Sequence, residues 1–393
     1  MGLRSIDLFH VAVPLKKPIR HASHERTSSA NLVVRVTLDD GQQGFGEGVP
    51  RDYVTGETIE STFTTLAKFD AARHLGTPRS FGDVIRRLEA LTLPETEADP
   101  RGMAGNSARC ALELAILDAY GHRFGQSLGE AIPLMETRGV QATASPRRVR
   151  YSGAITADDP RRERIAAWKM RVYGFSQTKL KVGVAGQDDP ARLARLRRIL
   201  GRRMDLRLDA NEAWRADEVV DRVRPLLAFS PSVLEQPVPH AEVDSLSDLR
   251  PKIGMPVMLD ESLCGYPDAV HAVEARTADL FNVRLSKCGG IVPTLRIVGL
   301  ALRSGLGVQL GCHPGETGFL SAAGRHVAGH VPSFRFVEGS YDRHVLAANL
   351  TIEDPTFGYG GWAPPILGPG LGVRVDLEAL DRLMVRREEV RFD

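Results

Sequence analysis

Four short segments between residues 178 and 262 decide the fold: Thr178-Lys179-Leu180-Lys181, Leu208-Asp209-Ala210-Asn211, Leu234-Glu235-Gln236-Pro237 and Leu259-Asp260-Glu261-Ser262. Each of them ends a run of apolar or β-forming residues with an ionisable side chain. The steps from Lys181 to Asp209, from Asp209 to Glu235 and from Glu235 to Asp260 are 28, 26 and 25 residues. One strand, one helix and two loops need about this length, so the spacing predicts successive βα units of a parallel sheet.

The same alternation extends on both sides of these segments. It predicts eight strands, at residues 151–155, 178–182, 205–208, 232–234, 256–259, 280–285, 307–310 and 334–337. Eight such units form a closed barrel of the α/β class, in which the carboxyl ends of all strands meet at one face. Residues far apart in the sequence would therefore meet around one mouth.

The two ends of the chain have a different character. Residues 1–135 are predicted to form an α+β domain, with a hairpin over 32–38 and 43–47 and helices near 58–75 and 107–124. Residues 150–350 would be the barrel. A turn-rich C-terminal segment, residues 351–393, is expected to return to the first domain, which would cap the barrel.

Composition excludes several classes of function. The net charge of +2 gives no basic field for nucleic acid, and no apolar run reaches the length of a membrane span. The four cysteines show no CxxC spacing and are expected to be reduced, as in a cytoplasmic protein. Only eight of the 51 basic residues are lysines, and Lys179 and Lys181 are two of them.

Three carboxylates, Asp209, Glu235 and Asp260, end three successive predicted strands. Alone, each could be a helix cap or a solvated loop residue. Together at one mouth they would repel one another unless a divalent cation neutralised them. A ligand set of oxygens without His or Cys favours Mg²⁺, so the sequence predicts a magnesium site.

The two lysines lie on the same side of their strand, because side chains alternate along a strand. Barrel interiors are normally filled with aliphatic side chains, so two ammonium groups there need a chemical reason. Their proximity would favour loss of a proton from one of them, which could then act as a general base. The alternative is a solvated edge strand with two exposed lysines.

These residues, with Ser286-Lys287-Cys288-Gly289-Gly290 and the C-terminal Gly368-Pro369-Gly370-Leu371-Gly372-Val373, resemble the enolase superfamily over nearly the whole chain. The muconate cycloisomerase and dipeptide epimerase subgroup is the most similar, since Asp260 is followed by Glu261. The resemblance implies a modified TIM barrel of (β/α)7β type under an α+β cap, Mg²⁺ as cofactor and a small carboxylate as substrate. It also implies a homo-oligomer.

The resemblance further implies roles for individual residues. Lys181 would remove the proton α to the carboxylate, and Lys179 would contact that carboxylate. Asn211 and, in the capping loop, Thr55 would face the substrate. At the end of the eighth strand, Glu338, Ser340 and Asp342 loosely match an Asp-x-Asp that grips a substrate ammonium in dipeptide epimerases.

The sixth strand departs from the subgroup. Arg284 stands where a second lysine is expected, and an arginine remains protonated, so it can stabilise an anion but accepts no proton. Lys287 is expected to begin the loop and point away. His313, after the seventh strand, resembles the second base of the mandelate racemase branch, although its Asp partner is missing.

The leading interpretation is therefore a Mg²⁺-dependent isomerase or lyase that uses Lys181 as its one base and Arg284 as a cationic stabiliser, in a cycloisomerisation or syn elimination. The first alternative is an amino-acid or dipeptide racemase or epimerase with His313 or Lys287 as second base. The alternative from another class is a barrel that binds a carboxylate without converting it.

Overall fold

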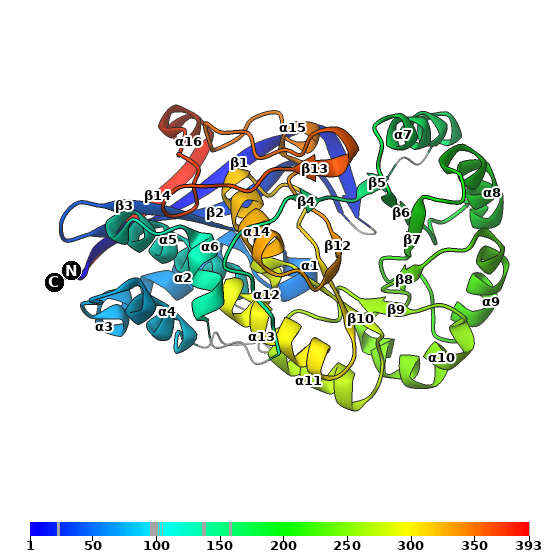
Figure 1. The fold of residues 1–393 in the computed structure, drawn as a ribbon, viewed down its shortest axis with the longest axis horizontal. Helices are drawn as coiled ribbons and strands as arrows, with labels where there is room; N and C mark the ends of the chain where they lie inside the picture. Colours follow the sequence, from blue (N-terminus) through cyan, green and yellow to red (C-terminus); the bar gives the residue numbers. More distant parts are fainter. Residues whose placement is uncertain are drawn as a thin grey trace.

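The computed structural model describes residues 1–21, 24–94, 101, 103, 105–135, 139–156 and 159–392. It contains a capping domain made from both chain ends and a barrel made from the middle of the chain (Figure 1). No helix among these residues combines the length and the apolar character needed to cross a bilayer.

The barrel sheet contains eight parallel strands in sequence order: β5 (Gly153–Ile155), β6 (Gln177–Lys181), β7 (Asp205–Asp209), β8 (Val233–Glu235), β9 (Val257–Leu259), β10 (Leu280–Val283), β11 (Gly307–Leu310) and β12 (Phe334–Val337). All eight predicted strands are confirmed. The sheet curls until a hydrogen bond from Ser152 N to Val337 O, 2.8 Å long, joins its two ends.

Helical segments connect the strands and surround the sheet: α7 (Pro160–Val172), α8 (Asp189–Leu200), α9 (Val219–Val223), α10 (Leu246–Ile253), α11 (Tyr266–Glu274), α12 (Leu285–Cys288), α13 (Ile291–Arg303) and α14 (Gly318–His330). Their apolar faces and the outer face of the parallel strands form one core, whereas Val233, Met258, Leu280 and Phe336 form a second, small cluster. This arrangement confirms the expected (β/α)7β architecture.

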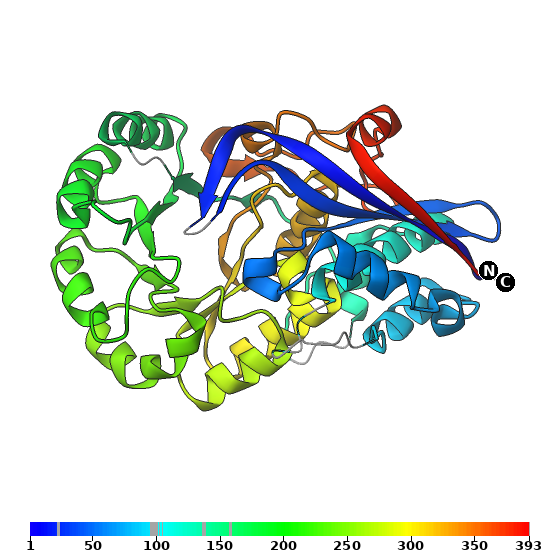
Figure 2. The ribbon, with the colours of Figure 1, turned by 180° about the vertical axis from the view of Figure 1, so that it is seen from behind.

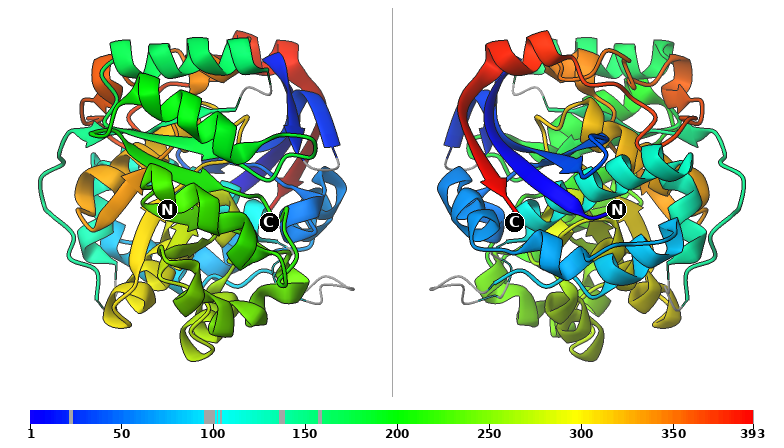
Figure 3. Two further views of the ribbon diagram at one scale, coloured as in Figure 1. Left: turned by 90° about the vertical axis from the view of Figure 1, so that its right-hand side faces the viewer. Right: turned by 90° about the vertical axis from the view of Figure 1, so that its left-hand side faces the viewer.

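The capping domain is built on an antiparallel sheet in the order β14-β1-β2-β3: β14 (Met384–Arg391), β1 (Leu3–His21), β2 (His24–Leu38) and β3 (Gln43–Gly48). Ser5 pairs with Arg391, so the chain ends run side by side, as the right view of Figure 3 shows. The predicted return of the C-terminal segment to the first domain is therefore seen in the sheet itself.

Helices cover one face of the capping sheet: α1 (Asp52–Thr55), α2 (Ile59–Ala67), α3 (Ala71–Leu75), α4 (Phe81–Glu89) and α5 (Asn106–Phe124). The helix expected over 58–75 is divided into α2 and α3, because Asp70 caps a new helix through a bond from Arg73 N. α5 lies directly on β3, where a Cβ on Gly46 would come within 2.1 Å of Ala111 O. The shorter elements α6 (Leu128–Ala131), α15 (Asp342–Val345) and α16 (Leu377–Leu383) complete the periphery.

Two buried carboxylates of the capping domain bind the amino ends of barrel helices. Glu47 of β3 accepts hydrogen bonds from Thr317 N (3.0 Å) and Leu320 N (3.2 Å) at the start of α14. Glu113 of α5 accepts hydrogen bonds from the backbone of Ile291 and Val292, at the start of α13. A carboxylate satisfies the unpaired N–H groups of a helix start and complements its dipole, so these two contacts fix the cap on the barrel.

Candidate active site

Adjacent strands place the ionisable residues next to one another at one end of the barrel. Lys181 is paired with Asp209, and Asp209 with Glu235, across β6, β7 and β8. Glu235 is opposite Met258, so Asp260 lies two residues further along the chain, directly after β9. The described part of the β1–β2 hairpin and α1 lie over this end in Figures 1 and 2.

Lys179 lies at the centre of a buried carboxylate cluster. Its Nζ is 3.2 Å from Asp209 Oδ2, 3.3 Å from Glu235 Oε2 and 3.1 Å from Glu338 Oε2. Burial alone would lower the pKa of Lys179, but these carboxylates outweigh it and hold the pKa well above its usual value. Lys179 is therefore a fixed cation, and Lys181 lies two residues further along the same face of β6, half-buried.

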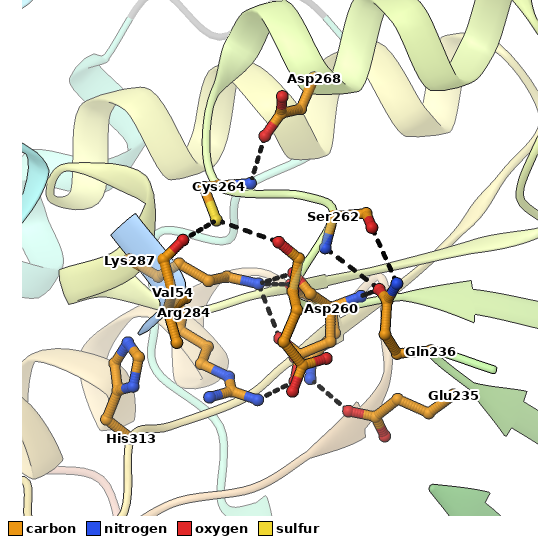
Figure 4. Close-up of polar contacts among 12 residues, drawn as sticks. Val54, Glu235, Gln236, Asp260, Ser262, Cys264, Asp268, Arg284, Lys287 and His313 are labelled. Atoms are coloured by element: carbon orange, nitrogen blue, oxygen red, sulfur yellow. Dashed lines mark hydrogen bonds and ion pairs between the residues drawn. The ribbon is translucent and has the colours of Figure 1, made fainter. Parts of the chain in front are cut away.

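Asp260 is held by two cations from the segment after β10 (Figure 4). Arg284 forms an ion pair with Asp260 Oδ2, and Lys287 Nζ is 2.7 Å from Oδ1. The Lys287 ammonium also donates to Asp260 O (2.7 Å) and Asn282 O (2.9 Å). The expectation that Lys287 points away is wrong: its side chain is fully buried, and all three N–H groups are used.

The single turn of helix α12 explains this orientation. Arg284 is the residue before α12 and Lys287 lies three residues later. Residues three apart in a helical turn share one side, so both cations reach Asp260. The sequence analysis placed Arg284 at the end of the sixth strand, but it did not predict the helical turn that directs Lys287 toward Asp260.

The carboxylates predicted to hold a metal are each bound to cationic side chains. Among the described residues, no three His, Cys, Asp or Glu side chains are gathered closely enough to hold a metal ion. The donor set nevertheless fits Mg²⁺, because Asp209, Glu235 and Asp260 offer only oxygens from the ends of three neighbouring strands. The assignment of these three residues as metal ligands stays a prediction.

Asn211 contacts a carboxyl that sequence reasoning did not include. Its Nδ2 donates to Glu261 Oε1 at 3.2 Å. Burial, together with the charge of Asp209, raises the pKa of Glu261 to about 8. Glu261 directly follows Asp260, so the Asp-Glu pair in the sequence was the signal for a second acidic group here.

His313 lies beside Arg284 in the loop that follows β11 (Figure 4). Its side chain is 3% exposed, and neither ring nitrogen forms a hydrogen bond with a residue that the structure describes. Burial and the nearby guanidinium groups of Arg284 and Arg51 hold the pKa of His313 well below its usual value. The imidazole is thus neutral at neutral pH.

The loop of His313 is supported by Glu316, which the sequence did not single out. His313 N donates to Glu316 Oε1 at 2.6 Å. Burial raises the pKa of Glu316 to about 8. The loop therefore contains a carboxyl that remains largely protonated at neutral pH.

The residues predicted to bind substrate at the end of β12 form ion pairs or hydrogen bonds with other residues of the protein. Glu338 contacts Arg207 Nη2 at 2.9 Å as well as Lys179. Although burial would raise the pKa of Glu338, Lys179 and Arg207 lower it to about 2. Glu338 is therefore a fixed anion inside the barrel.

Ser340 and Asp342 form hydrogen bonds within the protein, and their role as substrate ligands stays a prediction. Ser340 Oγ accepts a hydrogen bond from Arg325 Nη2 (3.0 Å), and Asp342 accepts one from Ser321 Oγ (2.6 Å) on α14. Both side chains are buried in these contacts. The partners come from distant segments, which local spacing does not reveal.

Thr55 is also bound elsewhere. Its hydroxyl donates to Glu57 Oε2 at 2.8 Å, and Glu57 in turn accepts hydrogen bonds from the first N–H groups of α5. Thr55 therefore supports the capping domain. Its role in substrate binding stays a prediction.

Arg207 is another buried residue that the sequence analysis did not single out. It is fully buried on β7, contacts Gln309 Oε1 and stacks on Phe336 at 4.4 Å. An arginine within Leu206-Arg207-Leu208, where a barrel interior is normally aliphatic, was the available signal.

Comparisons with known proteins agree with this geometry. Residues 162–380 match the family model described as enolase C-terminal domain-like. The N-succinyl-L-Arg/Lys racemase of Bacillus cereus is 27% identical over 100% of both chains, and its crystal structure superposes with a TM-score of 0.85. An L-Lys-D/L-Arg epimerase of Methylococcus capsulatus is 31% identical over 90% of this chain and 95% of the relative. Muconate cycloisomerase 1-2 of Acinetobacter lwoffii is 28% identical over 97% and 95% of the two chains.

The fold and the matched sequence place the protein among the enzymes of the enolase superfamily. Within it, the chain belongs to the mandelate racemase/muconate lactonizing enzyme family.

Proposed function

We propose that the protein is a Mg²⁺-dependent racemase or epimerase of an amino-acid derivative, with Lys181 and His313 as its two bases. The observation that carries this proposal is the buried imidazole of His313 beside Arg284, in the loop that follows β11. Lys181 ends β6, which is not a neighbour of β11 in the sheet, because β7 to β10 lie between the two strands. The racemase and epimerase relatives support the same reaction class.

His313 is the better second base because the other two candidates cannot readily accept a proton. Lys287 uses its three N–H groups on Asp260 and Asn282 and is fully buried. Arg284 accepts no proton at ordinary pH. A neutral imidazole, in contrast, accepts a proton at a ring nitrogen and can return it to the substrate.

Each residue then has a defined part in the reaction. Lys179, held as a cation, orients the substrate carboxylate, and Lys181 Nζ takes the α-proton from one face. In that direction the imidazolium form of His313 delivers a proton to the opposite face; in the reverse direction neutral His313 takes the α-proton and Lys181 Nζ delivers one. Mg²⁺ held by Asp209, Glu235 and Asp260 would stabilise the negative charge that develops on the substrate carboxylate.

Deuterium exchange tests this assignment. The L and D isomers of an N-acyl alanine are incubated with the enzyme and Mg²⁺ in D₂O, and α-deuterium and stereochemistry are measured. We expect exchange from both isomers with the parent enzyme. His313→Asn should abolish interconversion but retain exchange of the isomer whose proton faces Lys181, whereas His271→Asn, on the surface of α11, should behave as the parent. Interconversion at the parental rate by His313→Asn would refute the proposal.

The second candidate is the one-base isomerase or lyase, in which Lys181 acts alone. The fixed cation Arg284 beside Asp260 favours it, because a guanidinium there can stabilise an anion without exchanging a proton. The muconate cycloisomerase relative is consistent with this chemistry. It predicts exchange from one isomer only, with no effect of His313→Asn on that exchange.

A further inference from the structure

Asn282, on β10, is a fully buried polar residue inside the barrel that the proposed reaction does not use. Its Nδ2 donates a 2.8 Å hydrogen bond to Glu235 Oε1, which lies two strands away on β8. Its Oδ1 is also buried and has no hydrogen-bond partner among the described residues. An aliphatic side chain would avoid the cost of this unpaired acceptor, so the bond to Glu235 is what the amide contributes at this position.

The main chain of the same residue supports a second predicted metal ligand. Asn282 O accepts a 2.9 Å hydrogen bond from Lys287 Nζ. That ammonium also lies 2.7 Å from Asp260 Oδ1 and 2.7 Å from Asp260 O. Asn282 is therefore linked to Glu235 by its side chain, and to Asp260 by its carbonyl through Lys287. A metal ion shared by two carboxylates needs both of them in fixed positions, which this one residue connects.

An uncharged hydrogen-bond donor is well suited to this position behind Glu235. Glu235 Oε2 also lies 3.3 Å from Lys179 Nζ. An ammonium repels an approaching divalent cation, whereas an amide N–H holds the carboxylate without opposing the ion. Partners of this kind, which bind the ligands of a metal from behind, typically change metal affinity about 10- to 100-fold when they are removed. Asn282 has this relation to Glu235.

A glycine on the neighbouring strand leaves the space for this amide. Gly311 directly follows β11, which pairs with β10. A Cβ on Gly311 would lie 2.3 Å from Asn282 Oδ1 and 3.1 Å from Asn282 Nδ2. The φ angle of Gly311 is not in the left-handed region, so its backbone accepts other residues and only this contact opposes a side chain. Alanine at position 311 would therefore push the amide away from Glu235.

We infer that Asn282 is a positioning residue for the magnesium site: its side-chain amide orients Glu235, and its main-chain carbonyl fixes Lys287 and, through it, Asp260. The inference rests on the proposed function, because it concerns the metal site which that function requires. Gly311 belongs to the same arrangement, since it leaves room for the amide. Asn282 acts through Glu235 and touches neither the ion nor the substrate.

Calorimetric titration of the protein with MgCl₂ tests the inference without a substrate. We expect Asn282→Leu to weaken Mg²⁺ binding about 10- to 100-fold, and Gly311→Ala to weaken it by at least about 10-fold, because the new methyl group displaces the amide. Thr277→Val is the matched control. Thr277 precedes β10, is fully buried, and its Oγ1 has no hydrogen-bond partner within the described part of the chain, so its loss should leave Mg²⁺ affinity unchanged.

A double-mutant cycle separates positioning from general damage to the fold. Asn282→Ala removes the atoms that a new Cβ at position 311 would meet, so adding Gly311→Ala should weaken Mg²⁺ binding by less than about twofold more. Parental Mg²⁺ affinity in Asn282→Leu and Gly311→Ala, or full additivity in the cycle, would overturn the inference.

α-Proton exchange in D₂O, measured on the same variants, separates the inference from the proposed function. If Mg²⁺ binding depends on Asn282 but the parent exchanges no α-proton, the proposed function fails and the positioning role stands. If the parent exchanges α-protons but its Mg²⁺ affinity is independent of Asn282, the positioning role fails and the proposed function stands.

Discussion

Replacing Lys287 with methionine distinguishes a structural lysine from a second catalytic base. Methionine keeps most of the buried aliphatic volume but removes the ammonium that contacts Asp260 Oδ1 (2.7 Å), Asp260 O (2.7 Å) and Asn282 O (2.9 Å). Arg284 remains as a partner of the carboxylate. Removing one partner of a buried ion pair costs about 3–5 kcal/mol, and we expect the lower end because Arg284 stays.

The assay is urea unfolding of the metal-free protein, followed by circular dichroism and tryptophan fluorescence. Lys252→Met is the matched control: this lysine is exposed on α10, so its loss should change the unfolding free energy by less than about 0.5 kcal/mol. If Lys287→Met is as stable as the parent and loses proton exchange from only one stereoisomer, Lys287 is a base and the structural interpretation is wrong.

Three further predictions concern buried charges and the metal. Burial raises the pKa of Glu316 to about 8, so its stabilising contribution is present below its unfolded value near 4.5 and is lost as pH rises through 8. Glu316→Gln should therefore gain stability relative to the parent at pH 9 but not at pH 4, as urea midpoints would show; equal differences at both pH values would contradict this. Arg207→Met should cost about 3–5 kcal/mol, and adding Glu338→Gln should restore part of it; a double variant as unstable as the sum of both changes would argue against the pair. Mg²⁺ at about 100 times its dissociation constant should raise the unfolding free energy by about 2.7 kcal/mol, as thermal or urea unfolding would measure. Asp209→Asn should abolish this increase, and an unchanged increase would remove Asp209 from the metal site.

The sequence predicted the barrel well because strand length, helix length and loop length add to a nearly constant step. Lys181, Asp209 and Glu235 lie at the ends of their strands for the same reason. Alternation along β6 likewise placed Lys179 and Lys181 on one face. These features depend on local periodicity, which a single sequence displays.

What the sequence did not reveal depends on contacts between distant segments. Glu338 is bound by Arg207, 131 residues away, and Lys179, 159 residues away. Asp342 accepts a hydrogen bond from Ser321 on α14. The spacing of Glu338, Ser340 and Asp342 resembled a ligand motif, but partners supplied by other elements decide where such side chains point.

The helix-capping carboxylates Glu47 and Glu113 have a consequence for modularity. Excising the barrel as a separate fragment would leave the first N–H groups of α13 and α14 without acceptors, and those helices follow the loops of Lys287 and His313. The two parts should therefore melt in a single transition, and chimeras that exchange whole caps between relatives should need a matching carboxylate at both positions.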